Sequence, residues 1–235
     1  ADVHLGPLSS DAITRDFRIF QRKRGHRYSL DDLATAHYAV HSQPAAARCL
    51  DLGCGIGSVL LMLAWALPAA EFHGIEAQPE SVVLARRSAA RNGLDGRVQV
   101  HRGDLRSDCG KHLSGVFDLV TGTPPYLPVG SALASPDPQR AAARLELRGG
   151  IEDYLAAAAV WLAPAGRVVV CSDGRKPERV VAGAASAGLA PLRRIDIHPR
   201  SDAEPLFSVW VLARKPDDED QGVVDRVAAS LLHER

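Results

Sequence analysis

The 235-residue sequence lacks an excess of charge of either sign, a long apolar run and a recognisable secretory signal peptide. Because its 28 basic and 28 acidic residues cancel, no overall field draws the chain to nucleic acid or to a membrane. Any nucleic-acid surface therefore has to be a local patch. The longest apolar stretch, residues 59–70, is too short to span a bilayer. We expect a cytoplasmic protein with no membrane contact.

The sequence also lacks Cys-x-x-Cys pairs, metal-ligand spacing among its histidines, internal repeats and low-complexity tracts. Its cysteines fall on or beside predicted strands and turns, which indicates buried free thiols in a reducing compartment. We expect no metal ion. The four cysteines are Cys49, Cys54, Cys109 and Cys171.

Short apolar strands alternate with helical segments through the middle of the chain. The length and the 46% hydrophobic content suffice for one α/β domain with a full core. Alternation of this kind predicts a Rossmann-like, doubly wound, mostly parallel sheet of seven strands with an antiparallel last strand. Strands are predicted at 48–52, 72–76, 97–101, 115–122, 167–171, 192–198 and 207–213, and helices at about 29–40, 58–67, 79–92, 151–163 and 177–187.

Composition divides the chain into three segments. Residues 1–45 form an N-terminal extension, residues 46–216 form the main domain, and residues 217–235 combine an acidic linker with a terminal amphipathic helix predicted at 223–232. Within the main domain, residues 127–150 are rich in proline, alanine and arginine and show little periodicity. We expect a long loop there, and long loops in compact domains are usually functional or mobile.

A local basic cluster between residues 15 and 27 is interleaved with Phe17 and Phe20. One interpretation is a strip that binds a phosphate backbone and stacks bases on the aromatic rings. The other is an edge hairpin or helix whose phenylalanines dock on the core while its charges are solvated. The second is favoured because the neutral chain offers the cluster no further support. The cations are Arg15, Arg18, Arg22, Lys23, Arg24 and Arg27.

The segment Asp51-Leu52-Gly53-Cys54-Gly55-Ile56-Gly57 predicts a strand, a tight turn and the start of a helix. Glycines there let the backbone approach a ligand closely. The Gly-x-Gly-x-Gly spacing differs from the Gly-x-Gly-x-x-Gly of dinucleotide sites, where bare amides bind a pyrophosphate. It favours S-adenosylmethionine, whose ammonium group Asp51 could hold directly or through water.

Two further acids end neighbouring predicted strands. Glu76 stands about twenty residues after the turn, where a carboxylate can accept both ribose hydroxyls. Asp104 follows the third strand, where its carboxylate can accept from an adenine amino group. Acids at strand ends are common. Three of them on successive strands around a glycine turn, however, jointly indicate a site for this cofactor.

The segment Gly122-Thr123-Pro124-Pro125-Tyr126 closes the apolar run at 117–121. Two prolines disfavour a helix there and predict a rigid, extended turn with an aromatic ring at its tip. In an α/β sheet such a turn lies at the carboxyl ends of the strands, where ligands bind. We interpret it as the place where a planar, amine-bearing acceptor is held beside the cofactor.

With these motifs the chain resembles the class I S-adenosylmethionine-dependent methyltransferases over roughly residues 48–216. The Thr-Pro-Pro-Tyr turn is similar to the (Asn/Asp/Ser)-Pro-Pro-(Tyr/Phe/Trp) motif of amino-group methyltransferases. Ser29-Leu30-Asp31-Asp32 and Arg144-Leu145-Glu146 resemble the bacterial enzymes that methylate adenine N6 beside the anticodon of tRNA-Val. Release-factor glutamine methyltransferases share the acceptor motif, but they usually carry a helical N-terminal domain for which residues 1–45 are too short.

The resemblance implies S-adenosylmethionine as cofactor, S-adenosylhomocysteine as product, and the following roles. Cofactor-binding residues would be Asp31, Asp51, Gly53, Cys54, Gly55, Gly57, Glu76, Ala77, Asp104, Leu105 and Thr123. Catalytic residues would be Thr123, Pro124, Pro125 and Tyr126. Substrate-binding residues would be Tyr126, Arg144 and Glu146. For the charged residues of the long loop, an ion-paired loop is an equally open alternative to a substrate clamp; they are Arg140, Arg144, Glu146 and Arg148.

The implied mechanism methylates a weakly nucleophilic exocyclic amine. The Pro124 carbonyl and the side chain at position 123 would accept hydrogen bonds from its N–H groups, and Tyr126 would stack on the base. Thr123 departs from the usual Asn or Asp, because a hydroxyl is smaller and less polarising than an amide oxygen. The expected substrate is tRNA or another RNA, bound through the basic cluster. Alternative substrates are a protein glutamine or a small molecule, and an alternative function is a cofactor-binding module without turnover. A partner subunit or a homodimer is also open.

Overall fold

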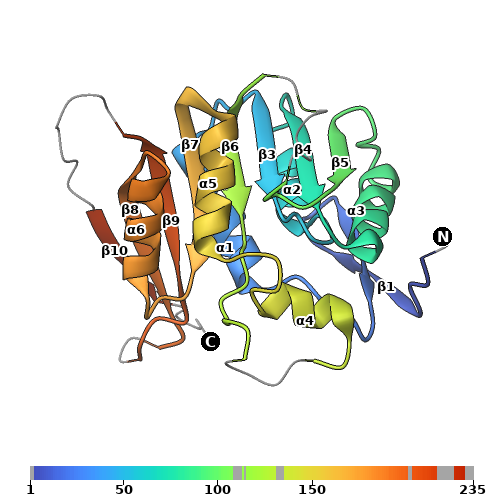
Figure 1. Ribbon diagram of the computed structural model, residues 1–235. Coiled ribbons are helices and arrows are strands. Elements are labelled where there is room, and N and C mark those ends of the chain that lie inside the picture. Colours follow the sequence, from blue (N-terminus) through green and yellow to red (C-terminus); the bar gives the residue numbers. More distant parts are fainter. Residues whose placement is uncertain are drawn as a thin grey trace.

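The computed structural model describes residues 3–107, 113, 115–130, 135–200 and 203–215, and the backbone of residues 225–230 (Figure 1). Its elements in chain order are β1 (Leu8–Ala12), β2 (Arg18–Arg22), α1 (Leu30–Ser42), β3 (Arg48–Leu52), α2 (Ser58–Ala66), β4 (Glu71–Glu76), α3 (Pro79–Arg91), β5 (Val98–Arg102), β6 (Phe117–Gly122), α4 (Pro138–Arg144), α5 (Ile151–Trp161), β7 (Leu162–Ser172), α6 (Pro177–Ser186), β8 (Leu189–His198), β9 (Phe207–Arg214) and β10 (Asp225–Ser230).

The predicted doubly wound sheet is confirmed. Its strand order is β10-β8-β9-β7-β6-β3-β4-β5, and β9 runs antiparallel to both of its neighbours while the other pairs are parallel. The chain winds outward through β3, β4 and β5, then returns to the other side of β3 with β6. The order of the strands therefore reverses between β3 and β6, which is where ligands bind in open α/β sheets.

Helices cover both faces of the sheet and enclose two apolar clusters. The first lies between the sheet and α1, α2 and α3, and the second lies under α5 and α6 (Figure 1). Residues of β3 divide between them, with Cys49 in the first cluster and Leu50 and Leu52 in the second. The central strands are buried on both sides, as parallel strands between helical layers should be.

The C-terminal helix predicted at 223–232 is wrong where the structure describes it. Residues 225–230 form β10, which pairs in parallel with β8 and sets Val227 opposite Ile195. The outer edge of β8 has backbone N–H and C=O groups that a further strand can pair with. This pairing in the tertiary structure overrides the local helical pattern of the sequence. The acidic linker at 217–220 and both ends of the predicted helix lie outside the described residues.

The basic cluster forms the antiparallel hairpin β1–β2, one of the two forms anticipated for it. Ile19 is fully buried in the first apolar cluster, and Phe20 packs against that cluster. Three of the six cations are paired with carboxylates: Arg15 with Asp16, Arg22 with Asp137 and Arg27 with Asp11.

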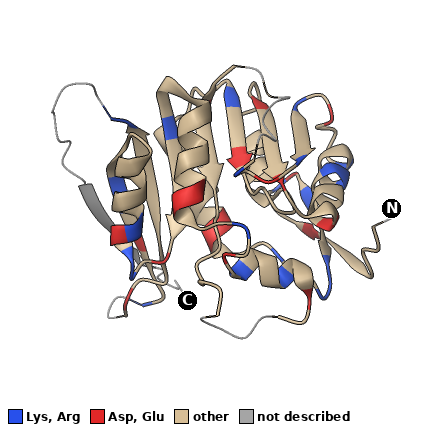
Figure 2. Cartoon of the chain, in the orientation of Figure 1, with Lys and Arg blue, Asp and Glu red and all other residues tan. Residues whose placement is uncertain are grey.

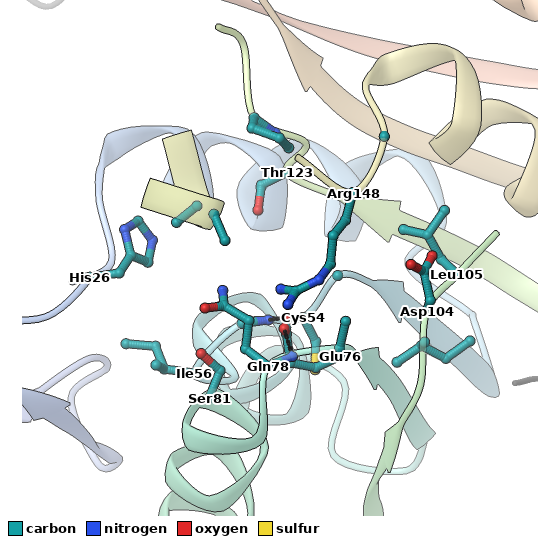
Figure 3. A pocket seen from close by; sticks show the side chains of 18 of the residues that line it. His26, Cys54, Ile56, Glu76, Gln78, Ser81, Asp104, Leu105, Thr123 and Arg148 are labelled. Atoms are coloured by element: carbon teal, nitrogen blue, oxygen red, sulfur yellow. Dashed lines mark hydrogen bonds between the residues drawn. The ribbon is translucent and has the colours of Figure 1, made fainter. Parts of the chain in front are cut away.

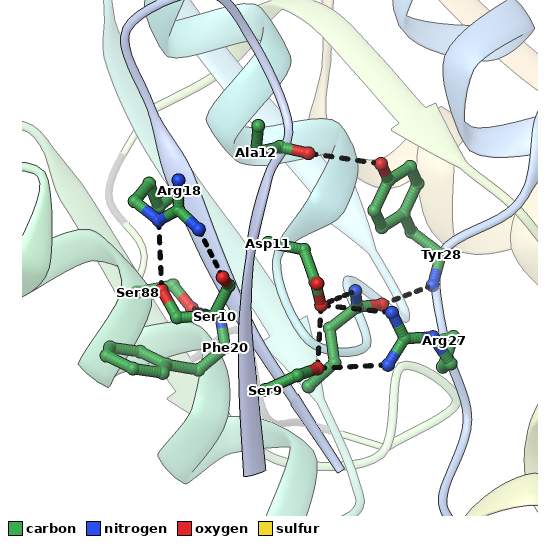
Figure 4. A network of polar contacts seen from close by, with 10 residues as sticks. Ser9, Ser10, Asp11, Ala12, Arg18, Phe20, Arg27, Tyr28 and Ser88 are labelled. Carbon is green, nitrogen blue, oxygen red and sulfur yellow. Dashed lines mark hydrogen bonds and ion pairs between the residues drawn. The ribbon is translucent and has the colours of Figure 1, made fainter. Parts of the chain in front are cut away.

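A polar network centred on Asp11 ties the hairpin to the segment that follows it (Figure 4). The Asp11 carboxylate accepts from the Ser9 hydroxyl at 2.7 Å, the Gln21 amide at 2.8 Å and Arg27 at 3.0 Å. The Oε1 of the Gln21 side chain in turn accepts from the Tyr28 N–H at 3.0 Å. The segment leading into α1 is thereby held in one place.

The long loop expected at 127–150 contains a short helix, α4, within its described part. Pro138 opens this helix, and the Asp137 carboxylate caps it by accepting from the Arg140 N–H at 3.0 Å. Fully buried Gln139 then anchors α4, donating to Ser81 of α3 at 3.0 Å and accepting from the His26 N–H at 3.2 Å. Residues 131–134 lie outside the described part.

None of the helices in the described residues combines the length and the apolar character needed to cross a membrane.

Candidate functional site

The glycine turn after β3 needs three left-handed backbone positions. Gly53, Gly55 and Gly57 have φ values of 60°, 55° and 85°. A Cβ at Gly53 would lie 2.1 Å from the Tyr154 hydroxyl, whereas a Cβ at Gly55 would meet only the Gly53 carbonyl oxygen, at 4.0 Å. Gly53 therefore accommodates a buried tyrosine, and Gly55 keeps open the space above the turn.

That space is a cavity of about 790 Å³, its opening to solvent included, which we call the donor cavity (Figure 3). The glycine turn, the ends of β4 and β5, the acceptor turn and α4 all contribute to its walls. Predicted site residues that line it are Gly53, Cys54, Gly55, Glu76, Ala77, Asp104, Leu105, Thr123 and Pro125. Other lining residues include His26, Asp32, Gln78, Ser81, Arg148 and Tyr154.

Glu76 is the buried acid of the donor cavity. One carboxylate oxygen accepts from the Gly55 N–H at 2.9 Å, and the other accepts from the Gln78 N–H at 2.6 Å. Burial raises the pKa of Glu76, and these backbone donors oppose that rise. The carboxylate thus fixes the glycine turn against the end of β4.

Asp104 has the opposite electrostatic character. It is partly exposed, and its carboxylate accepts from the Arg106 guanidinium at 2.7 and 3.0 Å. The hydrogen bonds from Arg106 lower the pKa of Asp104, so this acid stays ionised. Any adenine amino group bound there would share the carboxylate with Arg106.

Asp51 and Gly57 do not line the donor cavity, contrary to the simplest form of the prediction. The Asp51 carboxylate is buried against β6, where it accepts from the Thr121 hydroxyl at 2.8 Å. Burial raises the pKa of Asp51 to about 7. Gly57 instead closes the turn as the residue before α2.

Beside the donor cavity lies a second, more open hollow, which we call the acceptor pocket. It occupies about 1320 Å³ with its opening included, and it shares His26, Asp32, Thr123 and Pro125 with the donor cavity. Predicted residues that line it are Asp31, Thr123, Pro124, Pro125, Tyr126 and Arg144.

The Tyr126 ring is held in the acceptor pocket by its hydroxyl. That oxygen lies 3.1 Å from an Asp31 carboxylate oxygen and 3.0 Å from the Cys171 sulfur. Asp31 therefore contacts the acceptor turn. It was predicted to bind the cofactor, but it does not line the donor cavity. The neighbouring Asp32 lines both hollows.

The side chains of Arg144 and Glu146 lie in different surroundings. Arg144 lines the acceptor pocket, whereas the Glu146 carboxylate is bound by Arg179 at 2.6 Å. Glu152 shares the same guanidinium at 2.7 Å. Glu146 lines neither hollow, but it lies in a smaller one beside Pro124, Pro125 and Tyr126 of the acceptor turn. Its ion pair joins α6 to the loop before α5.

Several lining residues were not among the predicted cofactor-binding residues. Arg148 extends from the loop after α4 toward Cys54 and Glu76, while His26 faces the cavity from the other side (Figure 3). Burial lowers the pKa of His26. Local sequence carried no signal for His26, because only the docking of the hairpin against α4 brings it to the site.

The sequence matches the model of a methyltransferase domain over residues 44–170. The chain belongs to this methyltransferase family. The matched span runs from just before β3 into β7 and contains both motif turns, so the family match covers the residues that form the floor of the donor cavity.

Curated relatives act on two kinds of substrate. The tRNA1(Val) (adenine(37)-N6)-methyltransferase of Porphyromonas gingivalis is 32% identical over 69% of this chain and 65% of its own length. The release factor glutamine methyltransferase of Deinococcus radiodurans is 37% identical over 65% of this chain and 55% of its own length. The matched part of the chain thus spans less than two thirds of each relative.

Solved structures share the fold. A predicted O-methyltransferase from Agrobacterium tumefaciens has a TM-score of 0.65 at 20% identity and covers 87% of this chain and 88% of its own. TrmN from Thermus thermophilus has a TM-score of 0.53 at 20% identity and covers 76% of this chain and 48% of its own.

S-adenosylmethionine, the cofactor of this family, fits the donor cavity by two observations. A ligand can lie directly over the Gly55 backbone, where any side chain would project into the cavity. The walls also carry the carboxylates of Asp32, Glu76 and Asp104, which suit a ligand with two positive groups. No group of three or more candidate metal ligands occurs among the described residues.

Proposed function

We propose that this chain is an S-adenosylmethionine-dependent methyltransferase whose substrate is an exocyclic amino group, with adenine N6 in tRNA or another RNA as the leading candidate. One observation carries the proposal. Leu52 and Gly122 are paired neighbours on β3 and β6, so the glycine turn and the acceptor turn leave the sheet side by side. Thr123 and Pro125 consequently line both the donor cavity and the acceptor pocket.

The chain's own residues would bind and orient the two reactants. The glycine turn and Glu76 would hold the cofactor, which supplies the methyl group on a positively charged sulfur. The Pro124 carbonyl and the Thr123 hydroxyl would accept hydrogen bonds from the substrate amine, and Tyr126 would stack on the base. Positioning of this kind supplies most of the rate for an in-line transfer.

An RNA substrate is supported by the rim of the acceptor pocket. Four arginines from three separate segments line it: Arg27, Arg140, Arg144 and Arg175. Two of them are paired with acids, Arg27 with Asp11 and Arg175 with Asp173. Such a rim can bind phosphates locally even though the net charge of the chain is zero.

Only one end of the basic hairpin contributes to this rim. Gly25, His26 and Arg27 line the acceptor pocket, whereas Arg15 stacks over Trp65 beside an apolar groove between α1 and α2. We therefore propose that RNA contacts the segment from Arg22 to Arg27, and not the whole cluster.

A protein glutamine is the second candidate. The Deinococcus relative acts on release factors, and α4 partly roofs the donor cavity through Ala142 and Ala143. Against it, a glutamine substrate gains little from four arginines at the entrance. We also propose a cytoplasmic location, because Cys49, Cys54 and Cys171 are buried free thiols among the described residues.

The direct test incubates the protein with labelled S-adenosylmethionine and either bulk tRNA or release factors. We expect label in tRNA and N6-methyladenosine after nuclease digestion. Label in release factor alone would favour the glutamine substrate, and label in neither would contradict the enzyme hypotheses.

A charge reversal tests the rim. Arg144→Glu should weaken tRNA binding about tenfold and reduce the salt dependence of binding by about one unit, since one phosphate contact is lost. The matched control is Arg91→Glu, which reverses an exposed arginine at the far end of α3. Equal loss of binding in both variants would show that the effect is only one of net charge.

A further inference from the structure

The threonine of the acceptor turn has a defined hydrogen-bond partner on another element. Its hydroxyl donates to an Asp32 carboxylate oxygen at 3.3 Å, although the two residues lie 91 positions apart in the chain. Asp32 is buried, lines both hollows, and stands in the first turn of α1. Its other carboxylate oxygen accepts from the Ser29 N–H at 3.0 Å, which holds the side chain in place.

The direction of this hydrogen bond decides what Thr123 can offer a substrate. A hydroxyl has one hydrogen and two lone pairs. While the hydrogen points to Asp32, Thr123 presents lone pairs to the acceptor pocket. An amine substrate presents N–H groups, so a hydroxyl that turned its own hydrogen toward the pocket would oppose binding.

We propose that Asp32 is a positioning residue that orients the Thr123 hydroxyl as a hydrogen-bond acceptor for the substrate amine. The proposal rests on the proposed function and deepens it. It also explains how threonine can stand where related motifs carry an amide. A hydroxyl acts as an acceptor toward the pocket only while its own hydrogen points elsewhere, and Asp32 takes up that hydrogen.

The surroundings of Asp32 place its titration near neutral pH. Burial and the adjacent Asp31 raise the pKa of Asp32 to about 7, while hydrogen bonds from Ser29, Thr123 and Ser58 oppose the rise. Other titratable groups that face it are Asp51 on β3 and Cys171 on β7. His26, in the segment before α1, lines the same two hollows.

The sign of the pH effect follows from this chemistry. Ionised Asp32 only accepts hydrogen bonds, so it keeps the Thr123 hydrogen away from the substrate. Protonated Asp32 can donate to Thr123, which frees the threonine hydrogen to turn toward the pocket. The rate of methyl transfer should therefore fall as the pH drops through the pKa of Asp32.

A double-mutant cycle tests the proposal under single-turnover conditions. Asp32→Asn should slow methyl transfer roughly tenfold to a hundredfold, the range for losing a hydrogen bond to a charged group, and should remove the acidic limb of the pH profile. In a Thr123→Ala background the same change should have little effect, because no hydroxyl remains to be oriented. Asp95→Asn, an exposed and distant acid, is the matched control.

A second readout does not depend on turnover. Carboxyl resonances of ¹³C-labelled aspartates should show two titrations near neutrality, those of Asp32 and Asp51, and the Asp32 titration should disappear in Asp32→Asn. Thr123→Val should raise the pKa of Asp32, because the ionised form loses a donor.

The proposal is overturned if Thr123→Val leaves the Asp32 titration unchanged. Equal rate losses from Asp32→Asn in both Thr123 backgrounds would also overturn it. Failure of the proposed function looks different, because no substrate would be methylated although the Asp32 titration still responds to Thr123.

Discussion

The donor cavity and the acceptor pocket are adjacent, yet the chain builds them in different ways. The floor and acidic walls of the donor cavity come from the ends of three consecutive strands, β3, β4 and β5. The acceptor pocket gathers the hairpin exit, the first turn of α1, the acceptor turn, α4 and the start of the segment after β7. One hollow is therefore made mostly by a local run of sequence, and the other is made by long-range packing.

Their charges differ as well. Three acids and one arginine line the donor cavity, whereas four arginines and three acids line the acceptor pocket. Figure 2 shows the basic residues of α4 and the acidic residues in the first turn of α5. A protein of zero net charge thus has an acidic site that suits a cationic cofactor, beside a basic rim that suits the anionic substrate we propose. A net charge of zero therefore excludes neither an acidic site nor a basic one.

Among substitutions that affect one hollow and not the other, Gly55→Val should have the largest effect, which is on cofactor binding. A β-branched residue at φ 55° is strained, and its side chain would project into the donor cavity. We expect loss of S-adenosylmethionine binding by about a hundredfold or more in calorimetric titration, since each 1.4 kcal/mol of lost binding is tenfold.

Gly93→Val is the matched control for backbone strain. Gly93 has φ 68° and open space where a Cβ would lie, with no atom within 4 Å, and it is remote from both hollows. Gly93→Val should lose about as much stability as Gly55→Val, yet it should bind the cofactor normally. Normal cofactor binding by Gly55→Val would contradict the assigned position of the donor.

An intermediate effect should come from Tyr126→Ala. Removing the ring deletes a stacking surface worth about 1–3 kcal/mol per base, so the apparent affinity for RNA should fall roughly fivefold to a hundredfold. Cofactor binding should change little, because Tyr126 lines the acceptor pocket and not the donor cavity. Tyr126→Phe keeps the ring and loses only the contacts to Asp31 and Cys171, so it should retain most of the RNA affinity.

The smallest effects concern stability, where two acids should respond to pH in opposite directions. The folded pKa of Asp51 is about 7 against an ordinary value of 3.8, so the free energy of unfolding should fall as pH rises between these values. Asp51→Asn should therefore raise the stability above pH 7 by roughly 1–4 kcal/mol, measured by denaturant titration.

Asp104 provides the contrast. Arg106 lowers the pKa of Asp104, so the stability that this pair contributes should be lost as pH falls through the folded pKa. Because the pair is partly exposed, Asp104→Asn should cost less than about 1 kcal/mol at neutral pH. Loss of cofactor binding in Asp51→Asn would instead support the role predicted for Asp51 from the sequence.

Most strands and helices could be predicted because their signals are local. Pro79 at the start of α3 and the apolar centre of β7 carry such signals. The two elements that were missed depended on partners. α4 is seven residues long and is anchored by Gln139 to α3, and β10 exists because β8 has an edge to pair with. Neither partner is visible in the flanking sequence.

The site shows the same division. Gly53, Gly55, Glu76 and Asp104 line the donor cavity as their positions at strand ends predict. The ion pair of Glu146 with Arg179, 33 positions away, could not be assigned from the sequence, because its partner lies on a later helix. Asp51 was placed at the correct strand, but its carboxylate turns toward Thr121 of the neighbouring strand.

The sequence by itself determined the strand-turn-helix motif, the acids at successive strand ends and the rigid Pro-Pro-Tyr turn, because each depends on backbone geometry within a few residues. Tertiary structure alone decided that His26 and Arg148 enter the donor cavity, that four arginines surround the acceptor pocket, and that Asp32 meets Thr123. Those contacts exist only after β6 has returned beside β3 and the hairpin has docked on α3, since both events bring together residues that are far apart in the chain.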